Sequence, residues 1–211
     1  MEKAKKKTTL ENILNVAQEL FLNRGFAATS LDEICKHAKV TKGGFFHYFR
    51  SKECLAKKVL ERFCSNSRDH IRQAGCCDQL SDPLDRAFAL LDGITHLEPK
   101  KKHHGGCLIA TFIQELSMSH PEIQTLCVRG LKELASMLEV ELQCAQQKYK
   151  TQEPLDIHGL ANYCVVVIEG AQVMAKANGN KKIIQASIEH LKKYLLTLFT
   201  SNKGGRNERN K

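Results

Sequence analysis

The chain has 211 residues, of which 42% are hydrophobic and 26% charged, a balance that suits one or two folded domains and excludes a disordered chain. The most apolar stretch is interrupted by Glu169 and Gln172, so no run reaches the length of a membrane span and no membrane partner is predicted. Nine cysteines without a CxxC pair, after a start that lacks an apolar signal segment, are typical of reduced thiols in a cytoplasmic protein.

The formal net charge of +9 is concentrated at the two ends of the chain. Residues 1–52 hold 10 Lys/Arg against 5 Asp/Glu, and the last nine residues hold 4 against 1. The body between them is nearly neutral, with 18 against 17. A basic N-terminal segment favours a nucleic-acid partner, and a merely solvated basic surface is the alternative.

Two helices are predicted at the start of the chain. Over 10–24, apolar residues recur at steps of three and four, which indicates an amphipathic helix that ends at Gly25. Ser30 and Glu33 have the spacing of a capping box, which predicts a second, short helix over 30–38.

A third short helix is predicted over 41–49, where Thr41 can serve as its N-cap. Phe45 and Phe49 lie four residues apart, so both are expected to anchor this helix to the first two. Because only a short break separates the second and third helices, the three segments have the dimensions of a helix-turn-helix unit with 41–49 as its recognition helix.

The rest of the sequence also has helical patterns, with no alternating strand run and no internal repeat. Ser51 can cap a long helix that reaches residue 74. Further helical patterns cover residues 83–97, 107–119, 121–149, 155–177 and 181–199. The sequence therefore predicts an all-α fold of about nine helices.

The recognition segment carries polar and small residues that suit contact with DNA. The hydroxyl of Thr41 and the charge of Lys42 can approach a phosphate, and Gly43 lets the backbone come close to DNA at a cost of about 1 kcal/mol in helix propensity. His47 and Tyr48 fall on the side away from the two anchoring phenylalanines. Lys52 is expected to hold the flanking DNA backbone.

The stretch "LFLNRGFAATSLDEICKHAKVTKGGFFHYFRSKECL" resembles the DNA-binding domain of the TetR/AcrR family of transcriptional regulators. The resemblance implies an all-α fold of nine or ten helices. It also implies DNA contacts at Thr29, Ser30, Thr41, Lys42, Gly43, His47, Tyr48 and Lys52. The chain departs from the family at Phe46, where Tyr is usual, and at Gly44, where Thr or Ser is frequent, so Phe46 is not among the expected contacts.

Residues 155–177 are apolar on more than one face, which indicates a partner helix outside the chain's own core. The resemblance implies a homodimer formed by the last two helices. A two-fold dimer would present two recognition helices to successive major grooves of an inverted repeat. The expected interface residues are Val166, Gly170, Ala171, Ile188 and Leu195.

An effector site is implied by the resemblance, because such proteins enclose a small-molecule cavity among their middle helices. The candidate lining residues are Phe88, Cys107, Phe112, Met137 and Tyr163. Cys107 begins a helix, and its segment resembles that of a subgroup that includes thiol-based electrophile sensors. The alternative, which the sequence favours, is that Cys107 is a small helix-packing residue.

His103 and His104 near Cys107 raise a metal hypothesis. No second cluster of ligands has a recognisable spacing, so no metal and no cofactor are predicted.

The predicted organisation is a DNA-binding helix-turn-helix domain over 1–51, an effector-binding and dimerisation domain over 52–201, and a disordered basic tail over 202–211. The predicted function is that of a homodimeric repressor, released from an inverted-repeat operator by a small molecule or an electrophile. An activator or global regulator of the same fold is the first alternative, and an adaptor without DNA binding is the second. A helical enzyme is a third, but no catalytic set or phosphate loop supports it.

Overall fold

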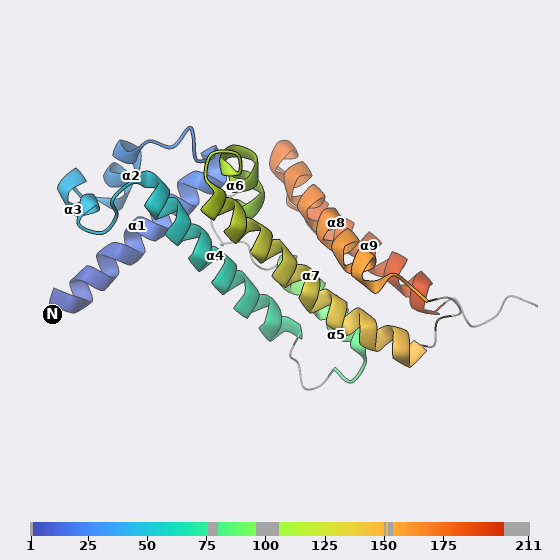
Figure 1. Ribbon diagram of the computed structural model, residues 1–211. Helices are drawn as coiled ribbons and strands as arrows, with labels where there is room; N and C mark the ends of the chain where they lie inside the picture. The colour runs from blue at the N-terminus through green and yellow to red at the C-terminus, as the bar shows by residue number, and fades with distance from the viewer. Residues whose placement is uncertain (1, 76–79, 96–105, 150, 152–153, 201–211) are drawn as a thin grey trace, which may run out of the picture. The chain divides into compact units, whose positions relative to one another are not determined.

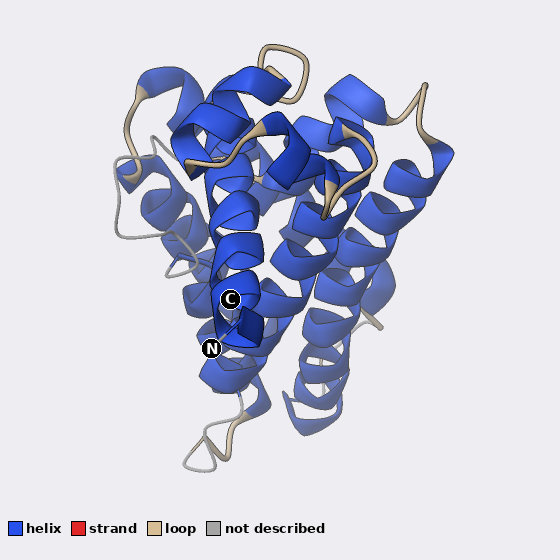
Figure 2. Cartoon of the chain, turned by 90° about the vertical axis from the view of Figure 1, so that its left-hand side faces the viewer, coloured by secondary structure: helices blue, strands red, loops and turns tan. Residues whose placement is uncertain are grey.

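The computed structural model describes residues 2–75, 80–95, 106–149, 151 and 154–200. All regular structure in these ranges is helical, as Figure 2 shows, which confirms the predicted fold class. The helices are α1 (Glu2–Arg24), α2 (Leu31–Ala38), α3 (Lys42–Phe46), α4 (Lys52–Gly75), α5 (Pro83–Thr95), α6 (Leu108–Leu116), α7 (Pro121–Tyr149), α8 (Ile157–Asn178) and α9 (Lys182–Thr200) (Figure 1).

The chain divides into two compact units. Unit 1 comprises Met1–Ser67 and Pro99–Leu131, and unit 2 comprises Arg68–Glu98 and Lys132–Lys211. Helix α6 and the first part of α7 therefore belong to the same unit as the helix-turn-helix segment, while the division after residue 51 stays a prediction. The tail over 202–211 lies outside the described residues.

The core of unit 1 is built around aromatic rings from α1, α3 and α6. Phe21, Phe45 and Phe112 are fully buried. The ring centroid of Phe112 lies 5.5 Å from that of Phe21. The rings of Phe45, in α3, and Phe49, just beyond its end, pack 5.6 Å apart and both are buried, as predicted. These contacts fix the first three helices and α6 as one packed body.

The starts of α2 and α3 are set by local hydrogen bonds. Ser30 and Glu33 form the predicted capping box. The Thr41 hydroxyl accepts a hydrogen bond from the Gly44 N–H at 3.0 Å. Helix α3 is shorter than the predicted 41–49, because it ends at Phe46 and His47 forms its C-cap. Two glycines among five residues give this helix little propensity to extend.

In unit 2, α8 and α9 pack side by side (Figure 1). The buried residues of α8 join a core with α5, α7 and α9 that includes Leu91, Leu138, Ile168 and Leu195. Among the described helices, α8 alone is long and apolar enough to cross a membrane by length and composition. The packing of α8 against α9 accounts for one of its apolar faces. A helix that is buried in a protein core can have the same apolar composition as a membrane span.

The N-terminus of α5 is tied to the C-terminal end of α7 through Asp82. Its carboxylate accepts hydrogen bonds from the Leu84 N–H at 2.8 Å, the Lys148 ammonium at 2.6 Å and the Tyr149 hydroxyl at 2.6 Å. Burial alone would raise the pKa of Asp82, but these hydrogen bonds outweigh it and lower the pKa to about 2. The hydrogen bond to Asp82 in turn raises the pKa of Tyr149 to about 12.

Candidate nucleic-acid interface

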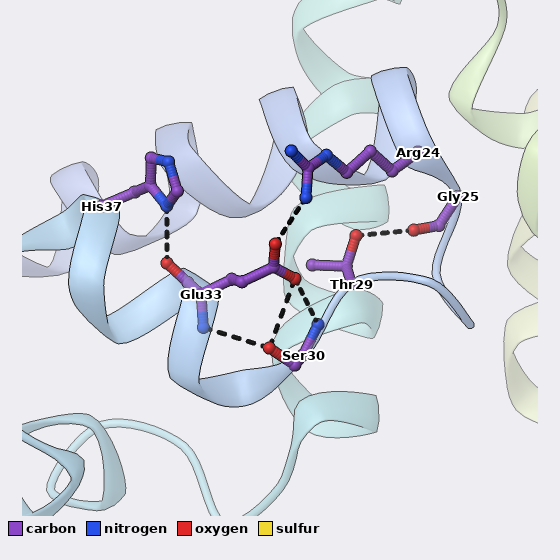
Figure 3. Close-up of polar contacts among 6 residues, drawn as sticks. All are labelled: Arg24, Gly25, Thr29, Ser30, Glu33 and His37. Atoms are coloured by element: carbon purple, nitrogen blue, oxygen red, sulfur yellow. Dashed lines mark hydrogen bonds and ion pairs between the residues drawn. The ribbon is translucent and has the colours of Figure 1, made fainter.

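The loop between α1 and α2 is held by the side chain of Thr29. Thr29 is fully buried, and its hydroxyl donates a hydrogen bond to the Gly25 carbonyl at 2.7 Å (Figure 3). A hydroxyl in this position is not available to DNA. The contact that the resemblance implies for Thr29 is therefore corrected to an internal hydrogen bond that shapes the loop.

Ser30 and Glu33 bind each other at the start of α2 (Figure 3). The Ser30 N–H donates to Glu33 Oε2 at 3.1 Å, and the Glu33 N–H donates to Ser30 Oγ at 3.2 Å. Arg24 forms an ion pair with the same carboxylate. The hydrogen bond from the Ser30 backbone, with smaller contributions that include Arg24, lowers the pKa of Glu33. Ser30 is exposed, as a DNA contact requires, but its hydroxyl already serves the cap.

The side chain of Lys52 is directed into the same loop. Its ammonium donates to the carbonyl oxygens of Phe26 at 3.0 Å and Thr29 at 2.9 Å. It also lies 4.0 Å from the centroid of the Phe26 ring, within the range of a cation–π contact. The Lys52 ammonium therefore holds the loop between α1 and α2, which is an alternative to the phosphate contact that the sequence predicts.

Helix α3 presents the remaining expected residues. Thr41, Lys42, Gly43 and His47 are exposed, and Tyr48 is half-buried. The ring of His47 lies edge-on to that of Tyr48, with centroids 5.1 Å apart. A Cβ at Gly43 would have only the Thr41 hydroxyl nearby, at 4.0 Å, so the backbone is open to a close approach there.

Lys42 pairs with Asp32 of α2 at 2.8 Å. The hydrogen bond to Asp32 raises the pKa of Lys42, which keeps the ammonium charged. Both side chains are well exposed, so a phosphate can replace Asp32 at little cost.

Two residues of unit 1 were missed by the sequence interpretation. Glu115 of α6 accepts a hydrogen bond from the Ala27 N–H at 2.7 Å, and its carboxylate fills the space where a side chain at Gly25 would lie. Gly25 has φ 85°, a conformation that favours glycine. No local pattern indicates the Ala27 contact, because its partners are 88 residues apart. The second is Phe46, the last residue of α3, whose side chain is 52% exposed although the sequence interpretation left it out of the expected contacts.

The five candidate effector residues are divided between the two units. Cys107, which is only 6% exposed, and Phe112 belong to the core of unit 1. Phe88 and Met137 pack against the core of unit 2, and Tyr163 is exposed. His103 and His104 lie outside the described residues. Within the described part of the chain, no group of three or more His, Cys, Asp or Glu residues could hold a metal.

The outward face of α8 differs from the expected dimer interface. Val166 is 66% exposed and Gly170 is exposed, as expected. Ala171, Ile188 and Leu195 are instead buried in the core of unit 2, which corrects their assignment to an outer surface. We call the exposed residues that share this side the outer stripe, and it consists of Tyr163, Val166, Gly170, Val173 and Met174. Tyr194 of α9 extends it, since its ring lies 5.8 Å from that of Tyr163.

A long first helix, a short second helix and a short, exposed third helix have the arrangement of a helix-turn-helix DNA-binding protein. Comparison with known families makes this class specific. Residues 13–59 match the family described as "Bacterial regulatory proteins, tetR family", and residues 83–191 match "Tetracyclin repressor-like, C-terminal domain". The chain belongs to the TetR family and is a DNA-binding transcriptional regulator, which confirms the resemblance found in the sequence.

Named relatives match most of the chain or about a quarter of it. The "HTH-type transcriptional repressor NemR" of Escherichia coli (strain K12) is 24% identical over 200 residues, which cover 93% of this chain and 98% of NemR. The "Transposon Tn10 TetC protein" of Escherichia coli is 45% identical over 49 residues, which cover 23% of this chain and 25% of TetC.

Solved structures agree on the fold. The reduced form of E. coli NemR aligns with a TM-score of 0.71 at 24% identity and covers 88% of this chain and 96% of that one. A TetR transcriptional regulator from Chloroflexus aurantiacus aligns with a TM-score of 0.77 at 21% identity and covers 91% and 96%. These likenesses extend the agreement from the helix-turn-helix unit to most of the chain.

Proposed function

We propose that the protein is a homodimeric repressor that acts in the cytoplasm, binds an inverted repeat in duplex DNA through α3, and leaves it when an effector binds. One observation carries the proposal: α3 is anchored from inside by Phe45 and Phe49 while Thr41, Lys42 and His47 remain exposed on its surface. The name of NemR as a repressor supports repression over activation. The position of the operator relative to the promoter would decide between the two.

The homodimer is supported by the outer stripe of α8. A continuous row of exposed apolar side chains on a long helix is unfavourable in water and marks a surface that another molecule covers. A second copy of the chain fits this role because an isologous contact buries the same stripe on both protomers. Such a dimer would present two α3 helices to half-sites about 34–36 Å apart.

The effector is proposed as a small molecule of open chemical class. The solved NemR structure is described as a reduced form, which makes an electrophile or oxidant the first class to test. In this chain Cys107 is buried beside Leu108 in the core of unit 1, which supports a packing role. A thiol-directed effector would have to open that core before it could react.

The test is binding of the full-length protein to DNA selected from random duplexes. We expect a palindromic consensus that is bound at least a thousandfold more tightly than random duplex at moderate salt. His47→Ala should cost about 1–3 kcal/mol on the consensus and relax the choice of base at one position of each half-site. Tyr48→Phe removes only a hydroxyl and tests its contact without disturbing the packing of the ring.

Met118→Ala is the matched control, because Met118 lies almost fully exposed between α6 and α7, outside the recognition helix. Its affinity for the consensus should equal that of the wild type. Equal binding of the wild type to all duplexes would overturn the proposal.

A further inference from the structure

Helix α3 exposes an aromatic side chain that its own core does not use. Phe45 and Phe49 are buried, whereas the next residue along from Phe45, Phe46, is 52% exposed. The rings of Phe45 and Phe46 meet edge to face with centroids 5.5 Å apart. One side of the Phe46 ring is therefore held by the core while the rest faces outward.

The surroundings of Phe46 are polar or empty. Gly43 precedes it by three residues and Lys42 by four, so all three share one side of α3. Lys42 is exposed, and Gly43 has no side chain to cover the ring. Phe46 is thus an isolated apolar patch within the surface that is proposed to enter the major groove.

The chemistry of the ring limits what it can contact in DNA. A phenyl ring has no donor or acceptor, so it cannot pair with the polar edges of guanine, adenine or cytosine. Against a phosphate it would displace water without replacing the lost hydrogen bonds, which is unfavourable. The apolar group that the major groove offers is the C5-methyl of thymine, and Phe is among the side chains suited to pack on it.

We propose that Phe46 is a specificity-determining residue that packs on the C5-methyl group of a thymine in each operator half-site. The proposal rests on the proposed function and adds to it a base and a chemical group. It also accounts for the presence of Phe where the TetR family usually has Tyr. The hydroxyl of a Tyr is absent here, and an apolar contact with DNA takes its place.

The experiment uses the full-length wild-type protein and its selected consensus. Each thymine of one half-site is replaced in turn by deoxyuridine, which removes the C5-methyl and leaves the base pairing unchanged. At one or two positions we expect wild-type affinity to fall about fourfold, the value for one buried methyl-sized group. Phe46→Ala should bind the thymine and uracil duplexes equally at those positions.

Two further variants keep the test decisive. Phe46→Tyr retains the ring and should retain the methyl dependence. Phe46→Gln replaces the ring by an amide and should lose the methyl dependence. A conclusion is therefore reached even when Phe46→Ala does not fold. His47→Ala is the control on the same helix, and it should keep the methyl dependence at the same thymine.

The outcomes separate this proposal from the one on which it rests. A wild type that selects no half-site overturns the proposed function. A half-site in which no thymine methyl affects affinity, or one whose methyl effect survives in a folded Phe46→Ala or Phe46→Gln, overturns the role of Phe46 and leaves the repressor proposal intact.

Discussion

Two lysines near the recognition helix carry the same charge in different surroundings. Lys42 is exposed beside Asp32, while Lys52 donates to two main-chain carbonyls and is half-buried. The carbonyls belong to Phe26 and Thr29, in the loop that orients α2. Lys42 is thus suited to contact a phosphate, and Lys52 is suited to position the structure that does so.

This difference predicts opposite results for two matched variants. Lys52→Met should lower the free energy of unfolding by about 1–2 kcal/mol, because two carbonyls lose a charged donor. The slope of log K against log salt should then stay unchanged. Lys42→Met should leave stability within about 0.5 kcal/mol and reduce that slope by about one, since one phosphate contact is lost.

Urea unfolding followed by circular dichroism and anisotropy titrations at several salt concentrations would measure both quantities. A stable Lys52→Met protein with a slope reduced by one would show instead that Lys52 binds phosphate.

At the scale of single residues, the sequence predicted the contacts between residues that are close together in the chain. The partners of the capping box, Ser30 and Glu33, are only three positions apart, so their spacing is sufficient evidence. The roles of Thr29 and Lys52 depend on the fold of the loop, and the Lys52 ammonium reaches carbonyls 23 and 26 residues away. Sequence resemblance marks such positions as important but does not separate DNA contact from support of the loop.

At the scale of the helices, the stability that the junction of α5 and α7 contributes depends on pH. The pKa of Asp82 is about 2 in the folded protein, below its ordinary value of 3.8. Its contribution to stability is therefore fully present above pH 3.8 and is lost as the pH falls through about 2. We expect this contribution to be about 1 kcal/mol, because solvent screens the partly exposed Lys148.

Asp82→Asn tests the junction. The variant should be about 1 kcal/mol less stable than the wild type at pH 7, and the difference should shrink as the pH falls from about 4 to 2. Asp85→Asn, in the exposed first turn of α5, should follow the wild type across this range. Urea unfolding at each pH gives the comparison, and a constant difference between Asp82→Asn and the wild type would contradict the assignment.

For α2 and α3 the start was predicted well, whereas α1 begins at Glu2, before the predicted residue 10, and α3 ends earlier than predicted. Capping residues mark the starts of α2 and α3 locally, and both were located from the sequence. The end of α3 was placed three residues too far, because Phe45 and Phe49 suggest a continuous helical face. In the structure Phe49 reaches the core from beyond the end of the helix, so tertiary packing and not helical periodicity sets its position.

At the scale of the whole molecule, the sequence indicated that α8 has two apolar sides but not which side is covered from within. Ala171 and Val166 are both plausible interface residues in a helix of this composition. The packing of α8 into the core of unit 2 makes Ala171 internal and leaves Val166 outside. Periodicity defines faces, and the partner of each face is a property of the folded chain.

The outer stripe leads to a prediction about assembly. Gly170 is suited to test it, because a Cβ at this position would have no neighbouring atom within 4 Å in the protomer. Gly170→Arg should therefore leave the protomer folded, and replacement of a helical glycine should favour α8 slightly. In a two-fold dimer, however, the substitution places two like charges in an apolar contact, at a cost of several kcal/mol.

We expect Gly170→Arg and Val166→Arg to be monomeric at micromolar concentration by light scattering, while the wild type is dimeric. In both variants, each protomer should keep its affinity for a single half-site. The affinity for the full operator should fall at least a hundredfold, because the two half-sites are no longer bound together. Val140→Arg is the matched control, because Val140 is an exposed valine of α7 in the same unit but outside the outer stripe. The dimer would form through a different surface if Gly170→Arg stayed dimeric or if Val140→Arg became monomeric as readily. The outer stripe would then need another partner.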